Sequence, residues 1–228
     1  MRSNGRSAPS SEPTARRLAW LVRLAAVTLV VGALSPLADA QPSAPTEAAL
    51  LHAFAQMPGL HARFHEVKHV ALLTMPLESD GEIDFAPPGR LMRKVTSPTP
   101  SWALLEGDRV TLASPGERRV VDLGTSPVVR GFVGAFRDVL AGDRAALERS
   151  YQLEFSTRGD EFTLRLRPRN ADLSRFLQEL TLHGRGLALT RIHMVETSGD
   201  VTDTTFSDVD PARRYTAHEI ATLFRLPD

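Results

Sequence analysis

His65, Glu66 and His69 form the pattern H-E-x-x-H within the stretch HEVKH. On a helix, the two histidines lie one turn apart and can share a zinc ion, while the glutamate activates a water molecule. On a strand, the histidines lie about 13 Å apart at ~3.3 Å per residue, and the glutamate points to the opposite face of the sheet. The chemistry open to this stretch therefore depends on the element that carries it.

The residues around HEVKH favour a strand. Pro58-Gly59 precedes it, and a regular series of turn signals follows it. A zinc site also needs a third ligand, and His183 and His193 lie in segments that we expect to form hairpins. We therefore predict a strand, with Phe64, Glu66 and Lys68 on one face, and we expect no metal site. The turn signals are Ser79-Asp80-Gly81, Pro87-Pro88-Gly89, Glu106-Gly107-Asp108, Pro115-Gly116, Arg158-Gly159-Asp160, His183-Gly184-Arg185-Gly186 and Ser198-Gly199-Asp200.

No other catalytic signature stands out. The sequence contains no G-x-S-x-G nucleophile elbow, no phosphate-binding loop and no dinucleotide fingerprint. Asp208 and Asp210 are interpreted as solvated loop residues rather than a catalytic acid pair. We expect a protein that is not an enzyme and needs no cofactor; a secreted hydrolase that uses His65 and His69 is the alternative.

The first forty residues have the composition of an export signal. Arg16, Arg17 and Arg23 precede or interrupt a long apolar run. Ala38-Asp39-Ala40 supplies the small residues that signal peptidase prefers. We therefore predict a cleaved signal peptide and a periplasmic protein. The uninterrupted apolar core, residues 24–34, is too short to span a bilayer comfortably.

Composition limits which classes of protein the rest of the chain can belong to. After residues 1–40 we expect a linker over residues 41–45 and one domain over residues 46–228. Without the signal, which carries five arginines and two acids, 22 basic and 25 acidic residues remain, so no basic field suggests nucleic acid. The chain has no cysteine, which excludes both disulfides and a lipid-modified N-terminal cysteine.

The domain's pattern is one of hairpins interrupted by helices. Thr46 caps a predicted helix that ends at Pro58-Gly59, and Thr216 with Glu219 forms a capping box for a last one. Residues 128–140 place an apolar stripe on a middle helix, and AALERS forms a short one after it. Between them, apolar and polar residues alternate at residues 81–85, 151–155 and 162–166, which is typical of an antiparallel sheet with one apolar face.

These segments, in order, resemble a known family. The pieces are FHEVK, PLESDGEIDF, PGRLMR, SWALLEGD, LAGD, FTLRLRP, IHMVE, SGD and TTF, spread over nearly the whole mature chain. Together they are similar to the periplasmic outer-membrane lipoprotein carrier LolA and its relatives.

The resemblance implies an α+β fold: an unclosed antiparallel β-barrel of about eleven strands covered by helices, with an apolar cavity inside. It implies a monomeric carrier that takes lipoprotein acyl chains from an inner-membrane donor transporter and passes them to an outer-membrane acceptor. Such exchange is physically reasonable because an acyl chain loses roughly 0.8 kcal/mol per CH₂ when it is exposed to water. Related carriers in glycolipid or aryl-polyene lipid export are an alternative, as is an adaptor that carries no lipid.

The apolar faces supply candidate lipid-binding residues. From the strands these are Ile83, Phe85, Leu91, Val95, Trp102, Leu104, Leu153, Phe155, Phe162 and Leu164; from the helical lid they are Phe132, Phe136, Val139 and Leu140.

The sequence departs from the family at one place. Carriers of this kind have an arginine directly before the proline after the second strand, where it bonds to the lid, but this chain reads Ala86-Pro87-Pro88. Arg90 and Arg93 are the candidates for the lid contact instead.

Overall fold

The structure, a computed structural model, describes residues 46–125 and 130–227, without the side chains of residues 131 and 132. The predicted signal peptide and linker lie outside these residues. Among the described residues, none of the helices has the length and hydrophobicity that a bilayer span requires.

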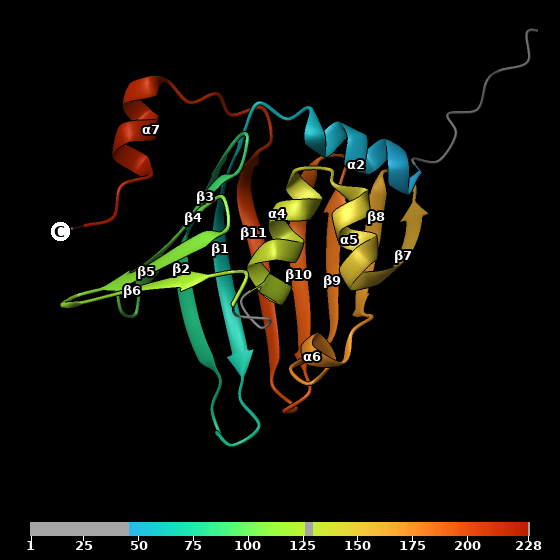
Figure 1. The fold of residues 1–228 in the computed structure, drawn as a ribbon, viewed down its shortest axis with the longest axis horizontal. Coiled ribbons are helices and arrows are strands. Elements are labelled where there is room, and N and C mark those ends of the chain that lie inside the picture. Colours follow the sequence, from blue (N-terminus) through green and yellow to red (C-terminus); the bar gives the residue numbers. More distant parts are fainter. Residues whose placement is uncertain (1–45, 126–129, 228) are drawn as a thin grey trace, which may run out of the picture. The chain divides into compact units, whose positions relative to one another are not determined.

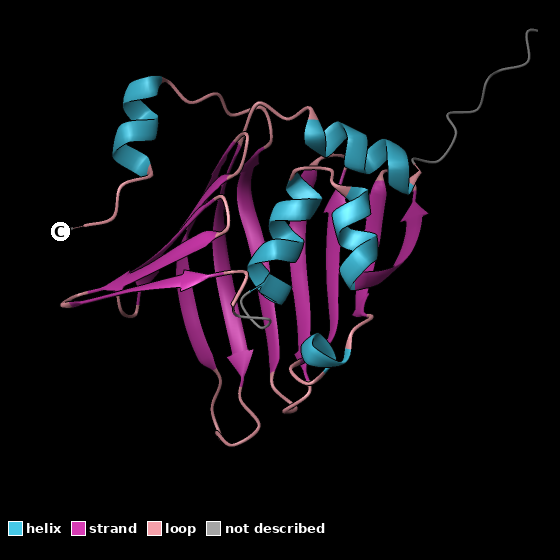
Figure 2. Ribbon diagram, in the orientation of Figure 1, coloured by secondary structure: helices cyan, strands magenta, loops and turns pink. Residues whose placement is uncertain are grey.

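Eleven antiparallel strands form one sheet, in the order β6-β5-β4-β3-β2-β1-β11-β10-β9-β8-β7 (Figures 1 and 2). Strands β6 and β7 are the two free edges, so the barrel is not closed. The predicted unclosed barrel is therefore confirmed. The strands are β1 (Leu60–His69), β2 (Leu77–Ala86), β3 (Arg90–Ser97), β4 (Ser101–Glu106), β5 (Arg109–Ser114), β6 (Glu117–Asp122), β7 (Tyr151–Arg158), β8 (Glu161–Pro168), β9 (Leu177–Arg185), β10 (Ala188–Glu196) and β11 (Val201–Asp210).

HEVKH lies within β1, as predicted. The strand pairs with β2 on one side and with β11 on the other, with Glu66 opposite Ser79 and Thr204. The two histidines therefore cannot lie one helical turn apart. His65 lies on the face opposite Glu66 and contacts Asp80 through Nδ1 at 2.9 Å.

The predicted turn Ser79-Asp80-Gly81 is part of strand β2, and the predicted turn at residues 183–186 begins later than expected, at Gly186 between β9 and β10. Gly81 lies inside β2 and Gly184 inside β9. A Cβ on Gly81 would lie 2.5 Å from the Phe64 ring, and one on Gly184 would lie 2.4 Å from the Phe162 ring. Each glycine therefore leaves room for a neighbouring aromatic ring close to its strand, a role that sequence cannot distinguish from a turn.

The helices are α2 (Glu47–Ala55), the π-helix η1 (Arg130–Gly134), α4 (Ala135–Leu140), α5 (Arg144–Ser150), α6 (Ala171–Ser174) and α7 (Ala217–Leu223). The Thr46 cap is present, with its Oγ1 accepting from the Ala49 amide at 3.1 Å. The middle helix differs from the prediction because its first part is a π-helix. Gly134 stands where η1 passes into α4, and it provides no side-chain cap. The wider turn of the π-helix comes first, so α4 continues a helix that has already begun.

Helices α2, α4 and α5 lie on one face of the sheet, over its β8–β11 half (Figure 1). The main core fills the space between them. Phe54 of α2 meets Phe162 of β8 edge to face, with ring centroids 6.1 Å apart. Val139 and Leu140 of α4 are completely or almost completely buried in the same cluster. This packing holds the helical layer against the sheet.

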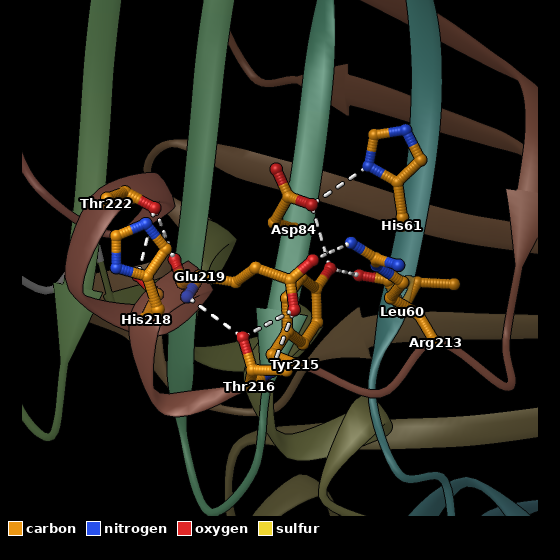
Figure 3. Close-up of polar contacts among 9 residues, drawn as sticks. All are labelled: Leu60, His61, Asp84, Arg213, Tyr215, Thr216, His218, Glu219 and Thr222. Carbon is orange, nitrogen blue, oxygen red and sulfur yellow. Dashed lines mark hydrogen bonds and ion pairs between the residues drawn. The ribbon is translucent and has the colours of Figure 1, made fainter.

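The C-terminal helix α7 makes a second, smaller core with residues of β2, β3 and β4. Phe224 packs with Ala86, Met92 and Leu104. The segment before α7 is fixed by Tyr215, whose hydroxyl lies 2.8 Å from Asp84 Oδ1 and 2.7 Å from the Leu60 carbonyl (Figure 3). Burial, and then the hydrogen bond to the Asp84 carboxylate, raise the pKa of Tyr215, so the phenol keeps its proton and remains a donor.

We predict that Tyr215→Phe lowers the free energy of unfolding by about 1.5–3 kcal/mol. The substitution keeps the ring on Phe224 but leaves the buried Asp84 carboxylate without one donor. Urea denaturation measures the loss. A change below about 0.5 kcal/mol would show that the cluster in Figure 3 does not anchor the C-terminal segment.

Candidate functional site: an apolar cavity under the lid helix

A cavity of ≈ 200 Å³ lies between the sheet and the segment η1–α4. The segment contributes Val133 and Phe136, and the rest of the wall comes from β1–β5 and β9–β11. Apart from a polar group described below, the lining is apolar: Phe64, Ile83, Leu91, Ala103, Leu105, Val110, Val133, Phe136, Leu180, Ile192, Met194 and Phe206. The geometry suits a flexible hydrocarbon rather than a charged substrate.

Arg93 is held in the cavity wall by two contacts. Its guanidinium carbon lies 4.4 Å from the centroid of the Phe64 ring, which lies across Gly81. Its Nη2 donates to Glu66 Oε1 at 3.0 Å. Strand alternation brings this about, since Phe64 and Glu66 lie on the same face of β1.

Glu66 joins that arginine to β11. Its second oxygen, Oε2, accepts from Thr204 Oγ1 at 3.0 Å. Thr202 lies two residues from Thr204 and also lines the cavity. The cavity wall thus carries a compact polar group, Glu66, Arg93, Thr202 and Thr204, which we call the polar strip.

Lys68 completes the alternation along β1. Its Nζ donates to Glu196 Oε1 at 2.8 Å and lies 3.7 Å from Asp200 Oδ2. The hydrogen bond to Glu196 raises the pKa of Lys68 in spite of partial burial. The lysine therefore ties the end of β1 to the β10–β11 turn and lies outside the cavity lining.

The segment η1–α4, which we call the lid, is attached to loops at the ends of the strands by its own arginines. Arg130 donates through Nε to the Leu123 carbonyl at 2.8 Å and through Nη2 to the Gly124 carbonyl at 2.7 Å. Arg137 donates through Nη1 to the Gly107 carbonyl at 3.2 Å and to an oxygen of the adjacent Asp108 at 2.9 Å. Both arginines therefore connect the lid to loops that follow β4 and β6.

Arg137 also contacts Asp138 at 3.0 Å. Burial raises the pKa of the Asp138 carboxyl, and the attraction of Arg137 only partly offsets this. For Arg137 itself, burial lowers the pKa, but its hydrogen bonds and ion pairs with Asp108 and Asp138 outweigh burial and raise it. The arginine stays charged and compensates a carboxylate that burial disfavours.

Three of the predicted lipid-binding residues line the cavity: Ile83, Leu91 and Phe136. Most of the others are placed in the main core instead. Phe85, Val139, Leu140, Phe162 and Leu164 are buried there, and Leu153 and Phe155 pack against it. The apolar face of a sheet continues beyond the cavity, so period-two alternation identifies the face but not the part of it that stays open.

The remaining candidates lie elsewhere. Val95 is buried but does not line this cavity. Trp102 and Leu104 lie in the smaller core with Phe224. Their positions in β4 alternate with those of Ala103 and Leu105, which do line the cavity. The side chain of Phe132 lies outside the described part of the structure.

The two arginine candidates for the lid contact have different surroundings. Arg90 forms an exposed ion pair with Glu106 at 3.1 Å. Arg93 shares the cavity lining with the lid residues Val133 and Phe136, and it donates a hydrogen bond to Glu66. Arg130 and Arg137, which bond to the sheet-side loops, were not candidates, because only a placed helix shows which of its polar side chains reach a neighbouring loop.

Sequence reasoning also missed the β9–β11 side of the cavity. Leu180, Ile192, Met194 and Phe206 line it, together with Thr202 and Thr204. Alternation of Thr202, Thr204 and Phe206 along one face of β11 was the available signal, but two threonines in such a row do not indicate an apolar face.

Known protein families and solved structures include proteins that are similar to this chain. The family model for outer membrane lipoprotein carrier protein LolA-like matches residues 39–224. No curated protein matches the chain. Among solved structures, a LolA superfamily protein from Nitrosomonas europaea has a TM-score of 0.45 and 14% identity, and the match covers 78% of this chain and 97% of that one. A putative outer membrane lipoprotein-sorting protein domain from Vibrio parahaemolyticus has a TM-score of 0.46 and 12% identity, with 80% and 98% covered. The Mycobacterium tuberculosis lipoprotein LppX has a TM-score of 0.38 and 11% identity, with 70% and 90% covered.

Proposed function

Because the chain belongs to the LolA-like family of outer membrane lipoprotein carrier proteins, we propose that it binds acyl chains in the cavity under the lid helix. The observation that carries the proposal is the lining itself, in which twelve of sixteen residues are apolar. Each buried CH₂ of a ligand gains about 0.8 kcal/mol, so a chain of modest length binds without any covalent step.

We further propose that the protein works in the periplasm as a carrier between membranes. In this proposal an inner-membrane transporter supplies a lipoprotein or another acylated lipid, and an outer-membrane acceptor removes it by offering more apolar contact. The export signal expected in residues 1–40 supports the location. Binding of acyl chains in this proposal needs no metal. The two histidines of HEVKH do not form a shared metal site, because the rise of strand β1 separates them.

Mass spectrometry of protein purified from the periplasm without detergent tests the proposal. We expect acylated molecules at close to one per protein, and their head groups would distinguish a lipoprotein from a glycolipid or an aryl-polyene lipid. Transfer of that cargo from inner-membrane to outer-membrane vesicles is the second measurement. Protein that copurifies with no acyl species and binds none when they are added would refute the proposal.

A further inference from the structure

Thr202 is unusual among the buried polar side chains of the described residues. Its exposed fraction is 6%, and its Oγ1 has no hydrogen-bond partner. Thr204 donates to Glu66, Thr181 donates to Glu179, and Asp84 accepts from Tyr215. A buried hydroxyl without a partner is unfavourable, and such groups in native proteins call for an explanation.

The position of Thr202 suggests that explanation. The side chain lines the apolar cavity, and in the sheet it lies between Met194 of β10, another lining residue, and Lys68 of β1. The Lys68 ammonium is directed to Glu196 and Asp200. The Thr202 hydroxyl has almost no accessible surface as it stands, and a turn about χ1 would present it to a molecule inside the cavity.

The charges of the polar strip limit what that molecule can be. Glu66 and Arg93 form an ion pair, so the strip has no net charge. A ligand carboxylate would lie close to the Glu66 carboxylate, while the arginine charge is already compensated. A neutral acceptor meets no such repulsion and can accept from the Thr202 hydroxyl or from a guanidinium N–H of Arg93, which has five donors.

We propose that the polar strip binds the neutral carbonyl of an acyl linkage, an ester or an amide, and that Thr202 is its hydrogen-bond donor. This inference rests on the proposed function, because it places the polar end of the same ligand whose chain fills the apolar part. It also predicts selectivity: the cavity discriminates linked acyl groups from free fatty acids.

The test uses the full mature chain and displacement of the fluorescent hydrocarbon probe N-phenyl-1-naphthylamine at pH 8. The competitors share a twelve-carbon chain: 1-monolauroylglycerol carries an ester, N-(2-hydroxyethyl)lauramide carries an amide, and laurate carries a free carboxylate. The variants are Thr202→Val, which keeps the shape without the hydroxyl, and Thr202→Ser, which keeps the hydroxyl. Thr205→Val is the matched control, because Thr205 is exposed and bonds to the His65 carbonyl outside the cavity.

We expect Thr202→Val to weaken binding of the ester or the amide roughly threefold to tenfold, the effect of one hydrogen bond. Thr202→Ser should restore most of the affinity, while the probe and laurate bind as before. A loss for only one of the two identifies the linkage that the strip recognises. The thermal midpoint of Thr202→Val should not fall, because an unpartnered hydroxyl is removed.

Two results would overturn the inference by itself. Either laurate binds wild-type protein as tightly as both neutral competitors, or Thr202→Val leaves their affinities unchanged while the probe still binds; acyl binding would then stand without carbonyl recognition. If wild-type protein binds neither the probe nor any competitor, the proposed function fails as well.

Discussion

Met194→Trp is expected to reduce acyl binding at least tenfold while the protein stays folded. Met194 is partly buried and lines the cavity, where it packs against the main core. An indole at this position occupies space that a ligand chain would fill, and each displaced CH₂ loses about 0.8 kcal/mol. Displacement of a bound fluorescent fatty ester measures the effect, and circular dichroism monitors the fold.

Met75→Trp is the matched control. Its side chain is 75% exposed in the connection between β1 and β2 and lies outside the cavity lining. The control should bind like the wild type. Equal affinities for the wild type and Met194→Trp would place the ligand somewhere other than this cavity.

Arg137→Met is expected to free the lid and to destabilise the protein by about 2 kcal/mol at pH 7. The substitution removes the bonds to Gly107 and Asp108 and leaves the partly buried Asp138 carboxylate without its Arg137 partner. Faster amide hydrogen exchange in α4 and faster ligand exchange are the direct measurements. Arg90→Met, which removes only an exposed ion pair, is the control and should cost less than about 1 kcal/mol.

The Arg137→Met effect should also depend on pH. Burial already raises the pKa of Asp138 in the folded protein, and loss of the neighbouring cation raises it further. A folded state that holds this proton more tightly than the unfolded state loses stability as the pH rises above the usual range of an aspartate. The loss caused by the substitution should therefore be larger at pH 7 than at pH 5. If amide hydrogen exchange in α4 were faster in Arg90→Met but not in Arg137→Met, Arg90 and not Arg137 would be the residue that holds the lid.

The sequence predicted the kind of fold because alternation and capping are local signals. The strand containing Phe64 and Glu66, the Thr46 cap and the Thr216–Glu219 capping box are all confirmed. Gly81 and Gly184 were assigned to turn signals, although Gly81 was also the first residue of the alternating segment 81–85, and both lie inside strands. Their role depends on aromatic rings from neighbouring strands, which lie far away in the sequence or have no local signature.

The cavity itself was much harder to predict. Ile83 and Phe85 have the same alternation in β2, yet Ile83 lines the cavity and Phe85 lies in the packed core. The difference is set by where the helices cover the sheet, which is a tertiary property. The ion pair of Glu66 with Arg93 could not be foreseen either, because it connects β1 to β3 across β2.

The open sheet has a consequence for how the molecule behaves at high concentration. Strands β6 and β7 each leave one row of backbone donors and acceptors without a neighbouring strand, and such rows invite another copy to add itself. Exposed charged residues lie on both: Glu117, Arg118, Arg119 and Asp122 on β6, and Arg158 on β7. Addition of a second copy would strip water from these charges, which disfavours fibre-like stacking at each edge while the sheet remains unclosed.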